Sequence, residues 1–148
     1  MCGILAIIGK GKDQALVKDL SKRMSHRGPD ESDIHITEKG HYLSHERLSI
    51  VDLHTGKQPI QGTSTAWMVH NGEIYNHQKL RETTLKQHRF RTTSDSEVIV
   101  HLYEEYGYDF LNKSRCHPPN NQNDDNADKC RREAKHPSPH CFDRFHYR

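Results

Sequence analysis

The sequence is poor in hydrophobic residues, which make up 32% of its 148 residues, against about 45–50% in a typical globular domain. The deficit is concentrated in residues 113–148, which contain no Val, Ile, Leu or Met. A segment without aliphatic side chains cannot build a core, so we expect residues 113–148 to be disordered or out-of-frame sequence. Residues 1–112 have an ordinary apolar pattern and are predicted to form one domain.

Other absences exclude whole classes of protein. The apolar run at 4–8 is too short for a signal peptide or a membrane span and has no basic residues before it, so we expect a cytoplasmic protein without a membrane partner. Four cysteines, three of them in residues 113–148, do not make a disulfide framework. The net charge is only +2, and residues 113–148 hold eight basic and five acidic residues. Residues 1–112 are therefore near neutral, which argues against a nucleic-acid partner.

Hydrophobic periodicity predicts secondary structure in blocks rather than in strict alternation. A buried strand is expected at 4–8 and a helix at 14–24 capped by Asp13, followed by a hairpin with arms at 34–36 and 42–44. Further strands are expected at 47–52, 66–70 and 90–92, and further helices at 77–86 after Asn76 and from the Ser94–Glu97 capping box to Gly107. Blocks of this kind favour an α+β fold.

Cys2 is the residue with the clearest chemical potential. If Met1 is removed, Cys2 carries a thiol on its β-carbon and a free α-amino group on the neighbouring α-carbon. A terminal amine has a pKa of about 7.7–8.0, so near pH 7 part of it is neutral and can take the thiol proton. Alone the indication is weak, because a cysteine at this position is more often a small buried hydrophobe.

Five short motifs in a fixed order carry a family resemblance. They are Met1-Cys2-Gly3-Ile4, Arg27-Gly28-Pro29-Asp30, Arg47-Leu48-Ser49-Ile50-Val51-Asp52 with Gln58-Pro59, Asn71-Gly72-Glu73-Ile74-Tyr75-Asn76, and Ser94-Asp95-Ser96-Glu97-Val98-Ile99. The sequence resembles the class II glutamine amidotransferase domains, and among them the N-terminal glutaminase domain of the glutamine-hydrolysing asparagine synthetases. The resemblance covers residues 1 to about 112, and residues 113–148 show none.

The resemblance implies a fold and a cellular role. The expected fold is α+β, the four-layer N-terminal-nucleophile hydrolase fold with antiparallel sheets between helices. We expect it to be incomplete at its C-terminal side, because the family's later core strands do not follow residue 112. The expected role is glutamine hydrolysis in asparagine biosynthesis, without a metal or other cofactor in this chain. In the family, ATP and Mg belong to a synthetase domain that is absent from the sequence, and that domain or a second copy of the chain is an expected partner.

The resemblance also assigns roles in binding L-glutamine. Cys2 is the nucleophile, Asn71 and Gly72 form the oxyanion hole, Arg47 takes the substrate carboxylate and Asp95 its ammonium. The remaining pocket residues are Leu48, Ser49, Ile50, Val51 and Glu73. These residue types suit the chemistry, because a guanidinium pairs bidentately with a carboxylate and amide N–H groups stabilise a developing oxyanion.

Each assignment has an alternative without a functional role. Arg47 alone reads as a solvated arginine on a strand edge, Asn71-Gly72 as a hairpin turn, and Asp95 as a first-turn carboxylate that complements a helix dipole. For the whole chain, the alternatives are an inactive remnant of an asparagine synthetase and the glutaminase domain of another class II amidotransferase. A zinc site in the tail is a weaker hypothesis, because its candidate ligands lack a close cysteine pair; these are Cys116, Cys130, His136 and His140.

Overall fold

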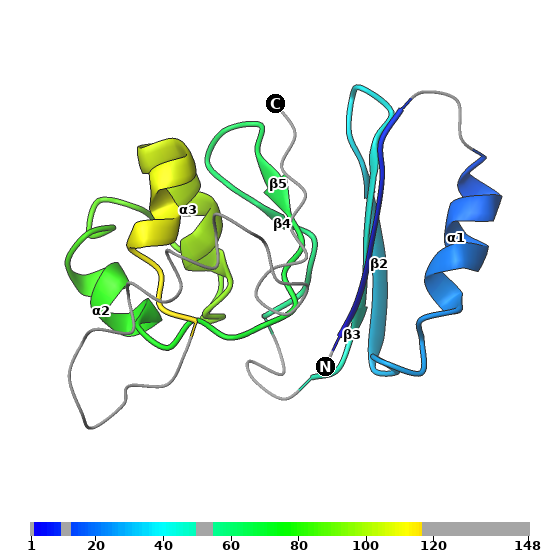
Figure 1. Cartoon of the computed structure of the whole chain (residues 1–148), viewed down its shortest axis with the longest axis horizontal. Helices are drawn as coiled ribbons and strands as arrows, with labels where there is room; N and C mark the ends of the chain where they lie inside the picture. The colour runs from blue at the N-terminus through cyan, green and yellow to red at the C-terminus, as the bar shows by residue number, and fades with distance from the viewer. Residues whose placement is uncertain (1, 10–12, 50–54, 117–148) are drawn as a thin grey trace.

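The computed structural model describes residues 2–9, 13–49 and 55–116. A three-stranded antiparallel sheet contains β1 (Gly3–Ile7), β2 (Glu31–Ile36) and β3 (Tyr42–Arg47), with β3 in the centre. Helix α1 (Gln14–Lys22) covers one face of this sheet (Figure 1). The carboxylate of Asp13 accepts a hydrogen bond from the Ala15 amide at 2.8 Å, which confirms the predicted cap.

The two faces of this sheet have different neighbours. On the face toward α1, the Ser21 hydroxyl bonds the side chains of Ser44 and Glu46. On the other face, His35 stacks on Trp67 with 3.5 Å between the ring centroids. Because side chains alternate along β3, Leu43, His45 and Arg47 share this second face.

The second half of the chain packs on this second face. A strand pair, β4 (Ile60–Gln61) and β5 (Trp67–Met68), lies between the sheet and the helices α2 (His77–Glu82) and α3 (Glu97–Tyr106), as Figure 1 shows. A short 3-10 helix, η1 (Gly107–Asn112), follows α3. The core of this half comprises Ile60, Met68, Ile74, Leu80, Leu85, Val98, Ile99, Val100, Leu102 and Phe110.

Several predicted boundaries differ from the structure. Arg47 ends β3 instead of starting a strand at 47–52, whose later residues lie outside the described part. Residues 90–92 do not form a strand, because the amides of Arg91 and Thr92 donate to the Glu97 carboxylate at 2.8 Å each. The same contacts replace the predicted capping box, and α3 begins at Glu97 itself.

The predicted end of the helix that follows Asn76 also differs from the structure. Helix α2 ends at Glu82 rather than near Lys86, and the Asn76 side chain does not cap it. Instead the Asn76 amide group donates to the Lys113 carbonyl at 2.8 Å and accepts from the Arg115 amide at 2.8 Å. Asn76 therefore ties the start of α2 to the segment after η1.

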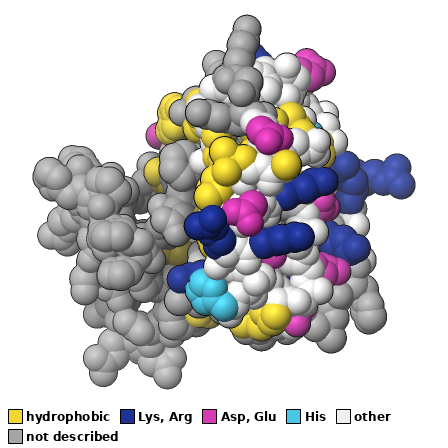
Figure 2. Space-filling model, turned by 90° about the vertical axis from the view of Figure 1, so that its right-hand side faces the viewer, with side chains coloured by type: hydrophobic (Ala, Val, Ile, Leu, Met, Phe, Trp, Pro, Cys, Tyr) yellow, Lys and Arg dark blue, Asp and Glu magenta, His cyan; other side chains and the backbone are white. Residues whose placement is uncertain are grey.

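The surface beside α1 mixes charges of both signs. Figure 2 views the molecule from this side and shows basic and acidic side chains interspersed with apolar ones. Leu16 and Ile36 are exposed large hydrophobic residues of α1 and β2. Within the described ranges, no helix combines the length and the apolar character that crossing a membrane requires.

Candidate functional site

The sulfur of Cys2 lies where three segments meet. Cys2 precedes β1, and its Sγ accepts a hydrogen bond from the Leu48 amide at 3.4 Å and lies 3.8 Å from the Leu48 carbonyl oxygen. Arg27 Nε donates to the Cys2 carbonyl at 3.2 Å. The sulfur is therefore held against the backbone of Leu48.

Asn71 holds the nitrogen of the same residue. Its Oδ1 accepts from the Cys2 backbone nitrogen at 3.0 Å, although the two residues are 69 positions apart in the sequence. An asparagine amide carries two donors beside its acceptor, so Nδ2 can serve another acceptor at the same time. The structure thus brings together Cys2, Leu48 and Asn71 from the predicted set.

A buried hydrogen-bond chain fixes the residue before Asn71. The Gln58 side chain pairs with the His70 backbone in both directions, at 3.1 Å to the carbonyl and 2.6 Å from the amide. His70 Nδ1 lies 2.9 Å from the Ser96 hydroxyl oxygen. A Cβ on Gly72 would approach His70 Nε2 to 2.8 Å, so a glycine is needed for this packing. The Asn71-Gly72 pair therefore sits on a rigid support rather than in a simple hairpin turn.

Asp95 is buried just before α3. Its Oδ2 accepts from the Ile74 amide at 2.7 Å, and its Oδ1 is 3.4 Å from the Ser96 hydroxyl. This carboxylate is therefore bonded to the segment that carries Gly72 and Glu73. The Glu73 side chain is exposed, and its hydrogen bond raises the pKa of the exposed Tyr75 phenol.

Arg47 is 4% exposed and ends the central strand, so the alternative of a solvated arginine on a strand edge is wrong. Its Nη1 donates to Glu31 Oε2 at 2.6 Å. The hydrogen bond and charge of Arg47 lower the pKa of Glu31 despite the opposing effect of burial. The pair lies in a pocket lined by Glu31, Ser32, Asp33, His45, Arg47, Lys57 and Gln58.

His45 lies beside this pair and is 1% exposed. Neither ring nitrogen has a hydrogen-bond partner of normal geometry among the described residues. Burial lowers the pKa of His45 to about 4, against a smaller opposing effect of the His70 backbone. The imidazole is therefore neutral at pH 7.

The remaining predicted pocket residues divide into two groups. Ser49 is partly exposed, and its amide donates to Asp30 Oδ2 at 2.7 Å. Ile50 and Val51 lie outside the described residues.

Several residues with structural importance at this site were not assigned a role from the sequence. The motif at 27–30 contributes to the family resemblance, but the sequence assigns no role to its residues. In the structure, Arg27 donates a hydrogen bond to the Cys2 carbonyl, and Asp30 accepts one from the Ser49 amide. A Cβ on Gly28 would come within 2.1 Å of the Glu46 carbonyl oxygen. Gln58 also belonged to a recognised motif, whereas Glu31 and His70 carried no sequence signal.

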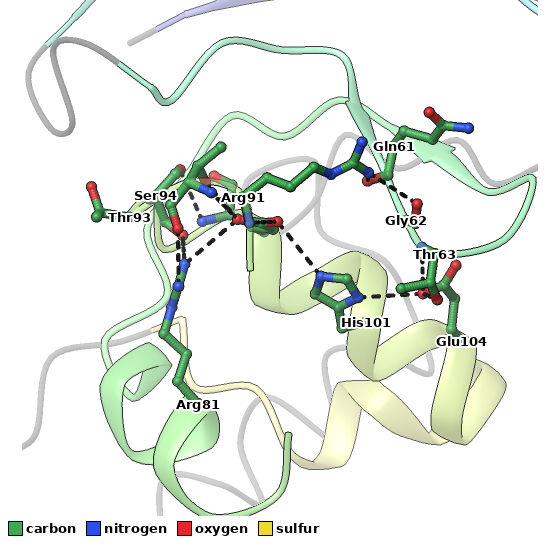
Figure 3. Close-up of polar contacts among 12 residues, drawn as sticks. Gln61, Gly62, Thr63, Arg81, Arg91, Thr93, Ser94, His101 and Glu104 are labelled. Carbon is green, nitrogen blue, oxygen red and sulfur yellow. Dashed lines mark hydrogen bonds and ion pairs between the residues drawn. The ribbon is translucent and has the colours of Figure 1, made fainter. Parts of the chain in front are cut away.

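One group of potential metal ligands occurs in the described part of the chain, formed by His88, His101 and Glu104. Figure 3 shows Glu104 next to Thr63, with His101 directed toward it. The Glu104 oxygens already accept hydrogen bonds from the amide and hydroxyl groups of both Thr63 and Ser64, at 2.7–3.1 Å. This set therefore fits a hydrogen-bonded junction better than an open metal site.

Comparison with known proteins defines the class. A model of the glutamine amidotransferase domain matches residues 1–116, and the chain belongs to this family. The chain is similar to asparagine synthetase [glutamine-hydrolyzing] 1 and 3 of Arabidopsis thaliana, at 49% and 51% identity over 116 residues, and to asparagine synthetase [glutamine-hydrolyzing] 2 of Oryza sativa subsp. japonica, at 50% over 117. These matches confirm the resemblance drawn from the motifs. They cover 75% of this chain and 19–20% of each relative, so the chain spans about a fifth of the length of these relatives.

Proposed function

We propose that the chain hydrolyses the side-chain amide of L-glutamine to glutamate and ammonia. The observation that carries the proposal is the position of Cys2. Its sulfur accepts a hydrogen bond from the Leu48 amide, and its nitrogen donates a hydrogen bond to Asn71 Oδ1. The thiol of Cys2 provides a nucleophile, its α-amine a base, and the nearby side-chain amide of Asn71 an oxyanion donor. Membership of the glutamine amidotransferase family supports glutamine as the substrate.

The proposed reaction begins after removal of Met1. The Cys2 amine takes the thiol proton, and the thiolate attacks the side-chain carbonyl carbon of glutamine. The C–N bond of the amide then breaks, and the ammonium of Cys2 returns its proton to the leaving ammonia. Water cleaves the resulting γ-glutamyl thioester, which releases glutamate and restores the thiol. This half-reaction requires no metal or nucleotide.

Asn71 and Gly72 are the proposed donors to the oxyanion. With Oδ1 on the Cys2 nitrogen, the Asn71 Nδ2 group is available to the developing negative charge, together with the Gly72 amide. Loss of one such donor typically reduces the rate by about 10²–10³. The contacts of His70 with Gln58 and Ser96 support this pair by limiting its movement.

Arg47 and Asp95 are the proposed partners of the substrate's carboxylate and ammonium. Both are buried, which strengthens a charge-assisted hydrogen bond relative to the same bond in water. Leu48, Ser49, Ile50, Val51 and Glu73 complete the proposed pocket. Arg27 and Asp30 are added to the proposal as positioning residues, because they bond the Cys2 carbonyl and the Ser49 amide.

The wider context of the reaction is also part of the proposal. We assign the catalytic unit to residues 1–112, with the layers of Figure 1 as part of a four-layer N-terminal-nucleophile hydrolase fold. The ammonia acceptor belongs to asparagine synthesis, which the names of the relatives support. We expect that stage to require a synthetase domain with ATP and Mg, and the partner of this chain to be that domain or a second copy of the chain. A reduced thiol at Cys2 suits the cytoplasm, where disulfides are rare.

The test is a glutaminase assay on the full chain. Intact mass establishes whether Met1 is removed, release of glutamate from L-glutamine measures turnover, and an electrophilic glutamine analogue reports on the thiol. We expect turnover and a single label at Cys2, both lost in Cys2→Ala. A folded protein without Met1 that neither releases glutamate nor takes the label contradicts the proposal, as does undiminished activity in Cys2→Ala.

A further inference from the structure

Glu31, Arg47 and Cys2 lie in one row across the sheet. Glu31 of β2 pairs with Arg47 of β3, and Gly3 of β1 pairs with Glu46. Extending the β1–β3 register by one pair places Cys2 opposite Arg47, on the same face of the sheet. This face is the one that His35 shares, so it points toward β5 and the Asn71 loop.

Glu31 joins a buried cation to an exposed one. The Arg47 side chain is 5% exposed and Nη1 lies 2.6 Å from Glu31 Oε2, whereas the Lys57 side chain is 67% exposed and Nζ lies 3.7 Å from Glu31 Oε1. A buried guanidinium that loses its counter-charge is strongly disfavoured, so Arg47 requires a carboxylate when no substrate is bound. Glu31 supplies this carboxylate from the same chain.

We propose that Glu31 competes with the α-carboxylate of glutamine for Arg47 and thereby sets the affinity of the site for its substrate. This inference rests on the proposed function, because it takes Arg47 as the carboxylate-binding residue. When glutamine binds, Glu31 transfers to Lys57, which is already within ion-pair distance. Glu31 is thus a specificity-determining residue that takes no part in the chemical step.

The physical consequence is a reduced apparent affinity. A ligand that must displace an internal competitor has an apparent Kd equal to its intrinsic Kd divided by the fraction of molecules in which Arg47 is available. Arg47 lowers the pKa of Glu31, so the competing carboxylate stays ionised at the pH of the reaction. Ligands without an α-carboxylate do not need this exchange, and their affinity is independent of Glu31.

The experiment measures binding on the full chain in a Cys2→Ala background, which removes turnover. Two ligands are titrated by nuclear magnetic resonance, namely L-glutamine and 4-aminobutanamide, which has the same amide and amine but no α-carboxylate. We expect Glu31→Gln to lower the Kd for glutamine about 3–10-fold and to leave the Kd for 4-aminobutanamide unchanged. Lys57→Met should raise the Kd for glutamine about 2–3-fold, because Glu31 then loses its alternative partner.

The matched control is Glu38→Gln, which removes one exposed negative charge from the turn between β2 and β3. It should leave both Kd values unchanged, and circular dichroism checks that each variant is folded. If Glu31→Gln leaves the Kd for glutamine unchanged, raises it, or lowers the Kd for both ligands equally, the inference is overturned. Glutamine binding without hydrolysis by the Cys2 protein contradicts the proposed function alone. Absence of binding in every variant overturns both.

Discussion

Asn71 combines two tasks in one side chain. Its Oδ1 holds the Cys2 nitrogen at 3.0 Å, and its Nδ2 is the proposed donor to the oxyanion. We expect Asn71→Ala to lower kcat for glutamine hydrolysis by about 10²–10³. Initial rates of glutamate release measure the effect, with the exposed Asn112→Ala as the control. A decrease of less than about tenfold would mean that Asn71 is not an oxyanion donor.

Gly28 shows how closely the Arg27–Asp30 motif packs on β3. A Cβ at this position would lie 2.1 Å from the Glu46 carbonyl oxygen and 2.6 Å from the Arg47 carbonyl carbon, and both are backbone atoms that cannot rotate away. We expect Gly28→Ala to lower the free energy of unfolding by about 1–3 kcal/mol. Urea unfolding followed by circular dichroism provides the measurement. Ser25→Ala, an exposed substitution in the preceding turn, is the control, and equal stability of the two variants would contradict the prediction.

For single residues, the chemical roles were easier to predict from the sequence than the burial and the hydrogen-bond partners of each side chain. Cys2 and Asn71 were predicted to act together, and the structure places them in direct contact. The burial of Arg47 could not be predicted, because it depends on the place of β3 in the centre of the sheet. The Glu31–Arg47 pair depends on strand register, which neither residue reveals in the sequence.

Helix α3 anchors the loop between β4 and β5 through one carboxylate. Burial raises the pKa of Glu104, but hydrogen bonds from Ser64 and Thr63 outweigh it and lower the pKa to about 2. We expect Glu104→Gln to lower the free energy of unfolding by about 1–3 kcal/mol, because a neutral amide accepts these donors less strongly. Thermal unfolding at pH 7 measures the loss. The exposed Glu82→Gln in α2 is the control, and an equal loss in both variants would contradict an anchoring role.

The elements that the sequence predicted are those with a clear apolar period. β1, α1, the β2–β3 hairpin and α3 all occur where the pattern placed them. The predicted strand at 90–92 does not form, because backbone amides of this segment donate hydrogen bonds to the Glu97 carboxylate. A contact of this kind produces no periodic pattern of apolar residues in the sequence. The four-layer arrangement remains a proposal, since the described strands β4 and β5 contain only two residues each.

At the scale of the whole molecule, buried titratable groups define two acid-sensitive ranges. Burial lowers the pKa of His45 to about 4 from 6.5, so the unfolded chain binds this proton first and stability falls from about pH 6.5 to 4. Burial also lowers the pKa of His35, which acts in the same direction. For Glu97 and Glu104, burial raises the pKa, but hydrogen bonds prevail and lower it from 4.5 to about 2. Their contribution is present above about pH 4.5 and is lost from there to about pH 2.

Substitution separates the two ranges. His45→Leu removes the buried imidazole, so the fall in the free energy of unfolding between pH 6.5 and 4 should become shallower by up to about 1.4 kcal/mol per pH unit. Glu104→Gln should instead reduce the loss below pH 4.5 and leave the upper range unchanged. Urea unfolding at half-unit pH intervals measures both profiles, with the exposed His26→Gln as the control. An unaltered slope between pH 6.5 and 4 in His45→Leu would show that the imidazole takes up its proton over the same pH range in the folded as in the unfolded chain, and that the pocket beside Arg47 and Glu31 tolerates a second positive charge.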